Sequence, residues 1–344
     1  MSKVYVGMSG GVDSSLAAAL LKEQGHEVTG VYMKNWSKDL PGFTCPWKED
    51  YEDAKRVAVQ LGIDFKLYDF ETQYRHMVVD YMVSEYKKGR TPNPDIMCNQ
   101  EVKFKLFLNT AISDGADKIA TGHYCRTHNG KLLVGIDEIK DQSYFLYRVT
   151  SEALEKSLMP IGEYKKSEVR KLARKLGLYT ADKKDSQGIC FVGKVGIKEF
   201  LINELGSQEP GAIVDGGNGK VIGQHEGAIF YTIGQRHGLN VGGGLPYYVT
   251  HKNMNTNTVY VTTDLDDKDL WRQEITLEDI HWINGKPSTD KTYKARLRYR
   301  GPLIKATLKG NRLKLENEVR GVAAGQSAVI YDDQLVLGGG VVTN

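Results

Sequence analysis

The chain has 344 residues, with 46 Lys and Arg against 43 Asp and Glu and a formal net charge of +3. At about 150 residues per domain, this length predicts two or three domains. The composition is 40% hydrophobic and 26% charged, which excludes a disordered, collagen-like or coiled-coil chain. There is no run of about 18 apolar residues and no secretory or transit signal, so we expect a cytoplasmic protein with no membrane partner.

The first half of the chain alternates short apolar runs with helical patterns. The runs predict strands at residues 4–8, 27–33, 65–70 and 118–121. Helices are expected between them, at 14–24, 50–61, 74–87 and 102–112. This alternation indicates βαβ units and a parallel sheet, whose ligands bind at the carboxyl ends of the strands.

Further strands are expected near the edge of this domain at 131–136 and 144–149, followed by a basic helix at 165–176. After residue 209, glycine-rich turns separate short β-branched or aromatic runs, which is typical of a small barrel or sandwich. These runs lie at 228–231, 247–250, 259–262, 293–299, 304–308, 328–331 and 336–337. We therefore predict three domains, at 1–209, 210–271 and 272–344.

A glycine- and serine-rich loop, Ser9-Gly-Gly-Val-Asp-Ser-Ser15, lies between the first strand and the first helix. Backbone N–H groups of such a loop can turn toward an anion, and the helix N-terminus adds positive potential. The loop lacks the lysine of a Walker A motif and does not match G-x-G-x-x-G. The alternative is a plain strand-to-helix turn with Ser or Asp as N-cap.

The S-G-G-x-D-S motif resembles that of the pyrophosphatase-loop (PP-loop) ATPases of the N type. The resemblance implies that the loop holds the pyrophosphate part of ATP and that AMP is transferred to a carbonyl oxygen. Asp13 would then lie near the phosphates and help to hold Mg²⁺. The motif alone leaves the nucleophile open between ammonia, an amine and sulfur.

Four cysteines occur, at positions 45, 98, 125 and 190, with no C-x-x-C pair and no zinc-like spacing. In a reducing compartment each is a small buried hydrophobe or a reactive thiol. We interpret Cys45 as structural. Cys98 follows Thr91-Pro-Asn-Pro-Asp95 and lies near a helix start, where the helix dipole lowers a thiol pKa. Asp95 can exchange a proton there, although a buried cysteine in a proline-rich cap fits as well.

The second unusual thiol, Cys190, lies in the polar segment Asp185-Ser-Gln-Gly-Ile-Cys-Phe191. Gly188 and the preceding Lys183-Lys184 predict an exposed loop thiol, with a structural cysteine as the alternative. Two thiols 92 positions apart can serve as a persulfide carrier and its resolving partner.

Several longer segments make the resemblance more specific. In chain order they are SGGVDSS, VYMKNW, GRTPNPDIMCNQEVKFK, ATGHY, KDQSYFLYR, DSQGICFVG and YTIGQRHGL. Over essentially the whole chain, this series resembles the tRNA-specific 2-thiouridylase (MnmA or TrmU) family. The resemblance implies ATP-dependent 2-thiolation of the wobble uridine in the tRNAs for Lys, Glu and Gln. It also implies a PP-loop (adenine nucleotide α-hydrolase-like) α/β domain, a small central β-rich domain and a tRNA-binding C-terminal β-barrel.

The resemblance assigns roles to residues of this sequence. The ATP-contacting positions are Gly7, Met8, Ser9, Gly10, Gly11, Val12, Asp13, Ser14, Met33 and Gly122. The positions that meet the target base or the tRNA are Asn93, Pro94 and Asp95, with Lys140, Asp141 and Gln142 in a second loop. Asp95 would be the acid/base, Cys190 would carry the persulfide, and Cys98 would attack that persulfide and end in a disulfide. Small departures from the family pattern occur at Gln187, after Cys45 and after Arg300.

The basic residues gather near the C-terminus. Residues 291–314 hold nine Lys or Arg and no Asp or Glu. Lys294, Arg296, Arg298 and Arg300 alternate with apolar residues, which predicts four cations on one strand face opposite an RNA backbone. We expect Arg298, Tyr299 and Arg300 to contact tRNA, and Tyr299 can stack on a base. The alternatives are a solvated barrel face and a core role for the tyrosine.

Two rival functions stay open at this point. One is another PP-loop adenylating enzyme, which would not need paired cysteines. The other is a non-catalytic tRNA-binding sulfur-relay protein, which would not need an intact SGGVDS loop. The expected partners are tRNA and a sulfur-donor protein, either a cysteine desulfurase or a sulfur-relay protein. The sequence does not separate direct persulfide attack from release of hydrosulfide.

Overall fold

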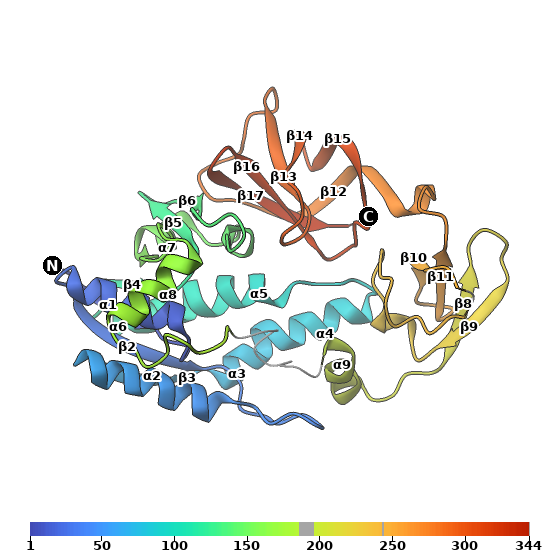
Figure 1. Ribbon diagram of the computed structural model, residues 1–344. Coiled ribbons are helices and arrows are strands. Elements are labelled where there is room, and N and C mark those ends of the chain that lie inside the picture. Colours follow the sequence, from blue (N-terminus) through green and yellow to red (C-terminus); the bar gives the residue numbers. More distant parts are fainter. Residues whose placement is uncertain (186–195, 243, 344) are drawn as a thin grey trace.

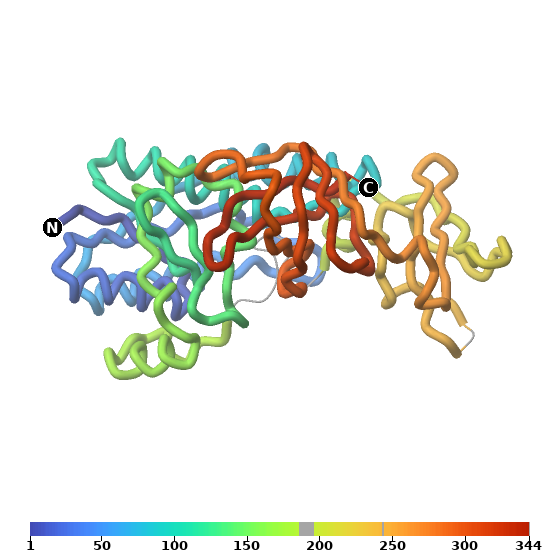
Figure 2. Tube along the Cα trace, turned by 90° about the horizontal axis from the view of Figure 1, so that it is seen from above, coloured from blue at the N-terminus to red at the C-terminus, as the bar shows by residue number. Residues whose placement is uncertain are grey.

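The computed structural model describes residues 1–185, 196–242 and 244–343. Figure 1 shows a sheet with helices at the N-terminal end, a barrel packed beside it, and a small β unit at the opposite end. The view from above in Figure 2 shows the same elongated arrangement, with the barrel between the two outer parts. No helix among the described residues is long and apolar enough to cross a membrane.

The N-terminal unit is built on a five-stranded parallel sheet. Its strand order is β3 (Asp64–Asp69), β2 (Glu27–Lys34), β1 (Lys3–Gly7), β4 (Lys118–Ala120) and β7 (Ser157–Leu158). The four strands expected here are confirmed, and so is the parallel α/β fold. The additional β7 has only two residues, which is too short for a recognisable pattern.

Helices cover both faces of this sheet because the strands are apolar on both sides. In β1, Val4 and Val6 pack with α1 (Val12–Glu23), whereas Tyr5 packs with the opposite cluster. The first face is completed by α2 (Trp47–Leu61) and α8 (Lys166–Lys175). The glycine loop therefore connects a buried strand to a buried helix, and its position is fixed by both.

The second face is covered by two long helices that contain π-helical segments. The first runs through α3 (Glu71–Tyr74), η1 (Arg75–Val79) and α4 (Asp80–Lys87). The second runs through α5 (Pro94–Met97), η2 (Cys98–Phe107) and α6 (Leu108–Ser113). Both expected helices are confirmed but begin earlier than predicted. The π-helical register, with hydrogen bonds from i to i+5, is often found at functional sites.

The C-terminal unit is a closed six-stranded antiparallel barrel. Its order is β12 (Trp271–Trp282), β15 (Arg312–Arg320), β14 (Ile304–Lys309), β13 (Thr292–Arg296), β16 (Ser327–Asp332) and β17 (Leu335–Val342), and β12 pairs with β17 to close it. Closure removes the free edges of the sheet. The spacing of turns predicted a small barrel or a sandwich, and the structure confirms the barrel.

Two expectations about residues 125–149 are corrected by the structure. The hairpin of β5 (Cys125–His128) and β6 (Lys131–Val134) forms, but β6 pairs with β17 of the barrel instead of lying at the parallel sheet. Residues 144–149 are not a strand, because Ser143–Leu146 forms a 3-10 turn. That run is apolar because Tyr144, Leu146 and Tyr147 are fully buried, and not because it belongs to a sheet.

The small central unit is a four-stranded sheet with the order β10 (Tyr248–Asn253), β11 (Thr258–Thr262), β8 (Gly211–Asp215) and β9 (Val221–His225), preceded by α9 (Ile197–Leu205). The strand expected at 228–231 is wrong, since Ala228–Phe230 forms a 3-10 helix. Gly227 precedes it with φ of 129°, a conformation that breaks an extended run. The exact domain limits near residues 209 and 272 stay predictions.

The barrel is tied to the N-terminal unit by two buried tyrosines. The Tyr144 hydroxyl donates to the carbonyl oxygen of Ser327 at 2.9 Å. The Tyr147 hydroxyl lies 3.1 Å from the Ser327 hydroxyl. Both tyrosines are 0% exposed, so water cannot reach their hydroxyl groups. Each hydrogen bond therefore satisfies a buried polar group that would otherwise have no partner.

We predict that Tyr144→Phe lowers the thermal midpoint of unfolding. The substitution keeps the ring but leaves a buried carbonyl without its donor, at a cost of about 1–3 kcal/mol. Tyr179→Phe is the matched control, because the Tyr179 side chain is 58% exposed. Differential scanning calorimetry of the three proteins tests this, and equal midpoints for Tyr144→Phe and the parent would contradict it.

Candidate active site

The glycine loop lies between β1 and α1 and is ordered by its own serines. The Ser9 N–H donates to the Ser14 hydroxyl at 3.1 Å. The hydroxyls of Ser14 and Ser15 donate to the carbonyl oxygen of Gly11 at 3.2 and 2.8 Å. Gly10 adopts φ of 72° where its backbone meets that of Asp50, so only glycine fits.

The N-terminus of α1 has no side-chain cap. Its N-cap residue is Gly11, and no side chain accepts a hydrogen bond from the first turn. The alternative of a plain turn capped by Ser or Asp is therefore wrong. Unsatisfied N–H groups at the start of a helix form a favourable site for a phosphate.

Three predicted ATP-contacting glycine and methionine positions converge on this loop from different strands. A Cβ atom on Gly7 would lie 2.9 Å from Cε of Met33, at the ends of β1 and β2. A Cβ atom on Gly122, just after β4, would lie 2.7 Å from the backbone nitrogen of Ser14. The structure thus brings these residues to the carboxyl edge of the sheet, where ligands of such sheets bind.

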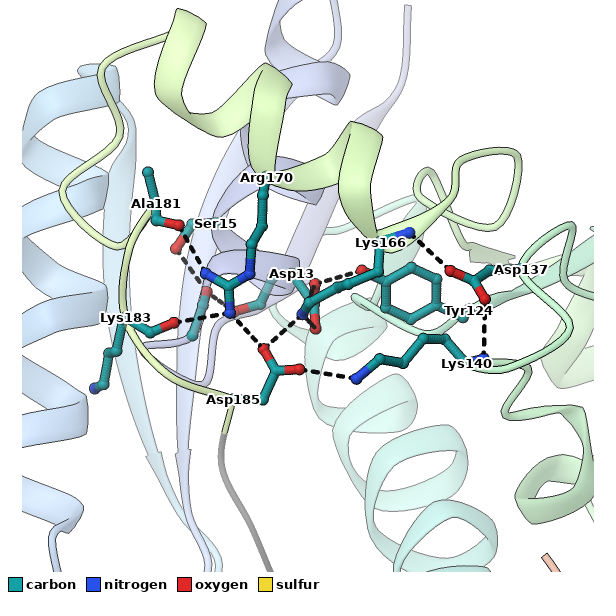
Figure 3. A network of polar contacts seen from close by, with 12 residues as sticks. Asp13, Ser15, Tyr124, Asp137, Lys140, Lys166, Arg170, Ala181, Lys183 and Asp185 are labelled. Atoms are coloured by element: carbon teal, nitrogen blue, oxygen red, sulfur yellow. Dashed lines mark hydrogen bonds and ion pairs between the residues drawn. The ribbon is translucent and has the colours of Figure 1, made fainter. Parts of the chain in front are cut away.

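Asp13 in the loop is bonded by two side chains that the sequence did not single out. The Tyr124 hydroxyl donates to Oδ1 of Asp13 at 2.7 Å. The Lys166 ammonium lies 2.8 Å from both carboxylate oxygens. Figure 3 shows both side chains pointing at this carboxylate. Burial, followed by the Asp13 charge, raises the pKa of Tyr124, so this hydroxyl stays a donor.

Three cations meet at Asp185, the last residue described before the gap at 186–195. Its carboxylate accepts from Lys166 at 2.7 Å, Lys140 at 2.9 Å and Arg170 at 2.8 Å. Burial alone would raise the Asp185 pKa, but the hydrogen bonds from Lys166 and Lys140 hold this pKa at about 2. Asp185 is therefore a charged residue that holds three cations at the edge of the glycine loop (Figure 3).

A magnesium ion would find only part of a coordination shell here. No cluster of three or more His, Cys, Asp or Glu suitable for a metal occurs among the described residues. Asp13 offers a single carboxylate, and its two oxygens already accept from Lys166. Mg²⁺ can be bound through one carboxylate with phosphate oxygens and water as the other ligands. The magnesium role of Asp13 stays a prediction.

The segment expected to meet the target base begins the long helix of α5 and η2. Asn93 is its N-cap, and its side-chain oxygen accepts from the N–H of Asp95 at 3.1 Å. Pro94 takes the first helical position, where its missing N–H costs nothing. Burial raises the pKa of Asp95, and the charge of Lys103 opposes this shift. A carboxyl group with a raised pKa is suited to accept and return a proton.

Cys98 lies one turn after Asp95 and is 7% exposed. Burial raises the pKa of its thiol, with Lys103 and a hydrogen bond involving Tyr74 acting in the other direction. The expectation that the helix start lowers this pKa is wrong, because removal from water outweighs the helix dipole here. Cys190 lies outside the described residues. Cys45 and Cys125 are buried, as expected for a structural Cys45.

Lys103 is a residue that the sequence analysis missed. Its charge acts on the pKa of Asp95, Cys98 and His123. Lys103 and Cys98 are five residues apart within η2, and the i to i+5 register of a π-helix places such residues near one another. In an ordinary α-helix Lys103 and Cys98 would lie on different faces, so no sequence pattern predicted that Lys103 acts on Cys98.

The second predicted tRNA loop is occupied by contacts within the chain. Lys140 pairs with Asp185. Asp141 is 4% exposed and accepts from Ser143 and from Arg296, and Gln142 accepts from the N–H of Tyr124. Their roles toward RNA stay predictions. A buried Asp141 supports the loop more readily than it faces a polyanion.

The predicted row of four cations on one strand face is not formed. Strand β13 ends at Arg296, whose side chain is 14% exposed and pairs with Asp141. Arg298 and Arg300 follow in a turn, with φ of 58° at Arg300, and both are exposed. Tyr299 packs on Phe145 with ring centroids 4.4 Å apart, which favours the structural alternative for this ring.

Three units meet at the residues just before the proline-rich segment. The N–H of Thr91 donates to the Ala324 carbonyl oxygen at 2.8 Å, and the Thr91 carbonyl oxygen accepts from Gln326 at 2.6 Å. The Thr91 hydroxyl lies 3.0 Å from that of Thr232 in the central unit. Arg90 pairs with Glu278 of the barrel. The barrel and the central unit therefore hold the start of this segment directly.

The fold and the uncapped glycine loop define a class, the nucleotide-binding α/β proteins with an accessory barrel. Family models agree with this. The tRNA methyl transferase HUP domain matches residues 2–194, the tRNA methyl transferase PRC-barrel domain 198–263, and the aminomethyltransferase beta-barrel domain 272–342.

Curated relatives give the family itself. The tRNA-specific 2-thiouridylase MnmA of Bacillus subtilis (strain 168) is 46% identical over 354 residues, covering 99% of this chain and 95% of the relative. MnmA 2 of Geobacillus kaustophilus is 45% identical over 352 residues, covering 99% and 94%. MnmA of Christiangramia forsetii is 43% identical over 396 residues, and the match covers 100% of this chain and 100% of the relative. The chain belongs to the tRNA-specific 2-thiouridylase MnmA family.

A solved complex of a 4-thiouridine synthetase with RNA and ATP is also similar, with a TM-score of 0.36 and 17% identity over 59% of this chain and 50% of that one. A likeness of this size supports no conclusion about this chain.

We predict that Gly122→Ala weakens ATP binding about tenfold or more. The new methyl group would meet backbone atoms of Asp13 and Ser14 at 2.7–2.8 Å, and the loop must move to admit it. Gly242→Ala is the control, since nothing lies near its Cβ position. Calorimetric titration with ATP measures both, and unchanged affinity for Gly122→Ala would show that the loop is not where ATP binds.

We predict that Cys98 reacts slowly with iodoacetamide at pH 7. The thiolate is the reacting form, and a raised pKa leaves little of it. The rate should rise with pH through a midpoint above the ordinary cysteine value of about 8.5. A variant with serine at positions 45, 125 and 190 isolates the signal for mass spectrometry. A rate at pH 7 equal to that of glutathione would contradict the burial argument.

Proposed function

We propose that this protein uses ATP to convert the 2-carbonyl of the wobble uridine in the tRNAs for Lys, Glu and Gln into a 2-thiocarbonyl. One observation carries the proposal. Gly122 contacts the nucleotide loop, and the next residue, His123, packs on Phe104 of the helix that bears Asp95 and Cys98, with ring centroids 5.8 Å apart. A nucleotide on the loop and a base at that helix would thus be neighbours. The names of the full-length relatives support the same activity.

The first step is adenylation of the base. The target uridine leaves its stack, since its 2-carbonyl is otherwise inaccessible. Its oxygen attacks the α-phosphate of ATP, and pyrophosphate leaves. Asp95, with its raised pKa, exchanges the accompanying proton. His123 is held neutral, because burial lowers its pKa well below the usual range, so it serves as a hydrogen-bonding group and not as a cation.

The second step replaces the adenylated oxygen by sulfur. The terminal sulfur of a persulfide on Cys190 attacks C2, AMP leaves, and the Cys98 thiolate then attacks the Cys190 sulfur to release the thiouridine. Alternatively Cys98 attacks the persulfide first, and the hydrosulfide set free attacks C2. Both routes consume one persulfide and one thiol and end in a Cys98–Cys190 disulfide, which cellular thiols reduce. A buried Cys98 is protected from other thiols until this encounter.

The supporting groups and partners belong to the proposal. Mg²⁺ entering with ATP would be held by the single carboxylate of Asp13, with phosphate oxygens and water as its other ligands, and it would offset the negative charge of the phosphates. A cysteine desulfurase or a sulfur-relay protein reloads Cys190. We place the reaction in the cytoplasm, and the exposed Arg298 and Arg300 contact the tRNA backbone.

The family models carry the words methyl transferase, whereas the relatives are named thiouridylases. The two chemistries make different nucleosides, and only thiolation needs both a nucleotide loop and paired thiols. Methyl transfer is therefore the disfavoured alternative.

We predict that Cys190→Ser and Cys98→Ser abolish 2-thiouridine formation while ATP binding persists, because neither thiol lies in the nucleotide loop. The measurement is mass spectrometry of tRNA nucleosides after incubation with ATP and a sulfur donor. Cys45→Ser is the control and should retain activity. Thiolation by the Cys190→Ser variant would contradict the assignment of Cys190 as the persulfide cysteine. Loss of thiolation in both variants together with a missing AMP and pyrophosphate signal in the parent would favour a sulfur-relay protein.

A further inference from the structure

A cavity of about 360 Å³ lies where the three units meet, and it shares no lining residue with the glycine loop. It is lined by Gly89 and Thr91 after α4, by Lys252 in β10 and by Arg272 in β12. Figure 1 shows these three elements converging beside the barrel. Sites for small molecules enclose roughly 300–1,000 Å³, so this cavity has room for one small ligand.

The lining of the cavity is positively charged. Lys252, Arg272 and the exposed His251 belong to it, and none of the described residues that line it is Asp or Glu. Both Lys252 and Arg272 donate to backbone carbonyl oxygens, and neither forms an ion pair with a described carboxylate. A carbonyl oxygen carries no net charge. The positive charge of the cavity is therefore not neutralised within the part of the chain that the structure describes.

Lys252 is the cation that depends most on its surroundings. Its side chain is partly buried, and its Cε lies 3.8 Å from the position that a Cβ on Gly89 would take. Burial lowers the pKa of Lys252 to about 8, and no carboxylate acts against this shift. An ammonium group that has lost water without gaining a counter-charge is stabilised when an anion enters beside it.

Both cations keep hydrogen-bond donors for a ligand. Lys252 donates to the Tyr231 carbonyl oxygen at 2.7 Å, which uses one of its three N–H groups. Nη1 of Arg272 donates to the carbonyl oxygens of Lys268 and Trp271 at 3.2 and 2.8 Å. Among the described residues, nothing accepts from Nε or Nη2 of Arg272. Ionised donors of this kind form their strongest hydrogen bonds with anionic oxygens.

The segment YTIGQRHGL, residues 231–239, builds one wall of this cavity. The Tyr231 carbonyl oxygen holds the Lys252 ammonium, and Ile233 lines the cavity. Between them, the Thr232 hydroxyl lies 3.0 Å from that of Thr91. The segment thus positions a cation and adds apolar surface, a combination that suits an anionic group carried on a larger body.

We propose that this cavity binds a phosphate group, with Lys252 and Arg272 as its cations. A phosphate carries a charge of about −2 and three terminal oxygens, which match two cations better than the single charge of a carboxylate. The phosphate belongs to a small phosphorylated molecule or to an RNA backbone, which present the same chemistry. This inference depends neither on the use of ATP nor on sulfur transfer.

The test is reductive labelling of the full chain with pyridoxal 5′-phosphate, whose aldehyde forms an imine with a lysine amine that borohydride then fixes. Peptide mass spectrometry compares Lys252 with Lys220, which is exposed between β8 and β9. Relative to Lys220, we expect Lys252 to be labelled at least about tenfold faster by pyridoxal 5′-phosphate than by pyridoxal, which lacks the phosphate.

A matched pair of variants tests the second cation. Arg272→Leu should reduce the preference of Lys252 for the phosphorylated reagent. Arg312→Leu, exposed on β15, is the control and should keep this preference. Circular dichroism melting checks the fold of both variants, and the comparison of the two reagents in the parent does not depend on either.

Protection of Lys252 distinguishes the two sources of phosphate. Slower labelling with inorganic phosphate but not with tRNA indicates a small phosphorylated ligand, and slower labelling with tRNA indicates an RNA backbone. Three outcomes would overturn the inference: no preference for the phosphorylated reagent at Lys252, labelling that neither inorganic phosphate nor tRNA slows, or a preference that Arg272→Leu leaves unchanged.

Discussion

The close approach of the backbone at Gly122 to the backbone of Asp13 and Ser14 is the constraint on which this site depends. The contact joins the end of β4 to the start of α1, and even one methyl group would not fit between them. Because β1 and β4 are hydrogen-bonded neighbours, the loop after one strand faces the loop after the other. His123 then follows directly and is buried beside the helix that bears Asp95 and Cys98. The glycine loop and the candidate base site are thereby held at a fixed separation.

Burial governs the chemistry of the candidate base site. Asp95 and Cys98 both have raised pKa values, so the apo protein holds a proton-exchanging carboxyl and a largely protonated thiol. Lys103 opposes both shifts without cancelling them. A buried thiol is a poor target for oxidants and unrelated disulfides.

The parallel sheet could be predicted from sequence because strand and helix periods are local and glycines end the helices. The glycine loop was equally local, whereas Gly7, Met33 and Gly122 were assigned to the same site only through the resemblance to a known family. The geometry of parallel strands explains why the structure brings them together. Other features depend on contacts between distant residues. The pairing of β6 with β17 joins residues about 200 positions apart, and no local pattern encodes it. The same holds for the contact between Lys166 and Asp13.

Local patterns were also misleading where burial had another cause. Residues 144–149 are apolar because they seal the contact between the N-terminal unit and the barrel through Tyr144 and Tyr147. Basic and apolar residues go on alternating after Lys294, but β13 ends at Arg296. The alternation therefore did not place all four cations on one face of a strand. For Cys98, its position near the helix start predicted a lowered thiol pKa. The sequence did not show the packing that buries the thiol and raises this pKa.

The barrel and the central unit contact the chain only a few residues before the helix that bears Asp95 and Cys98. Thr91 is bonded to both units, and Gly325 approaches it so closely that a Cβ would lie 2.8 Å from the Thr91 nitrogen. Two residues later Asn93 caps the helix that positions Asp95 and Cys98. Any movement of the barrel or the central unit would therefore be transmitted to the start of that helix, since Pro92 restricts the backbone between Thr91 and Asn93, and Pro94 begins the helix. The barrel and the central unit therefore help to set where Asp95 and Cys98 stand relative to the glycine loop.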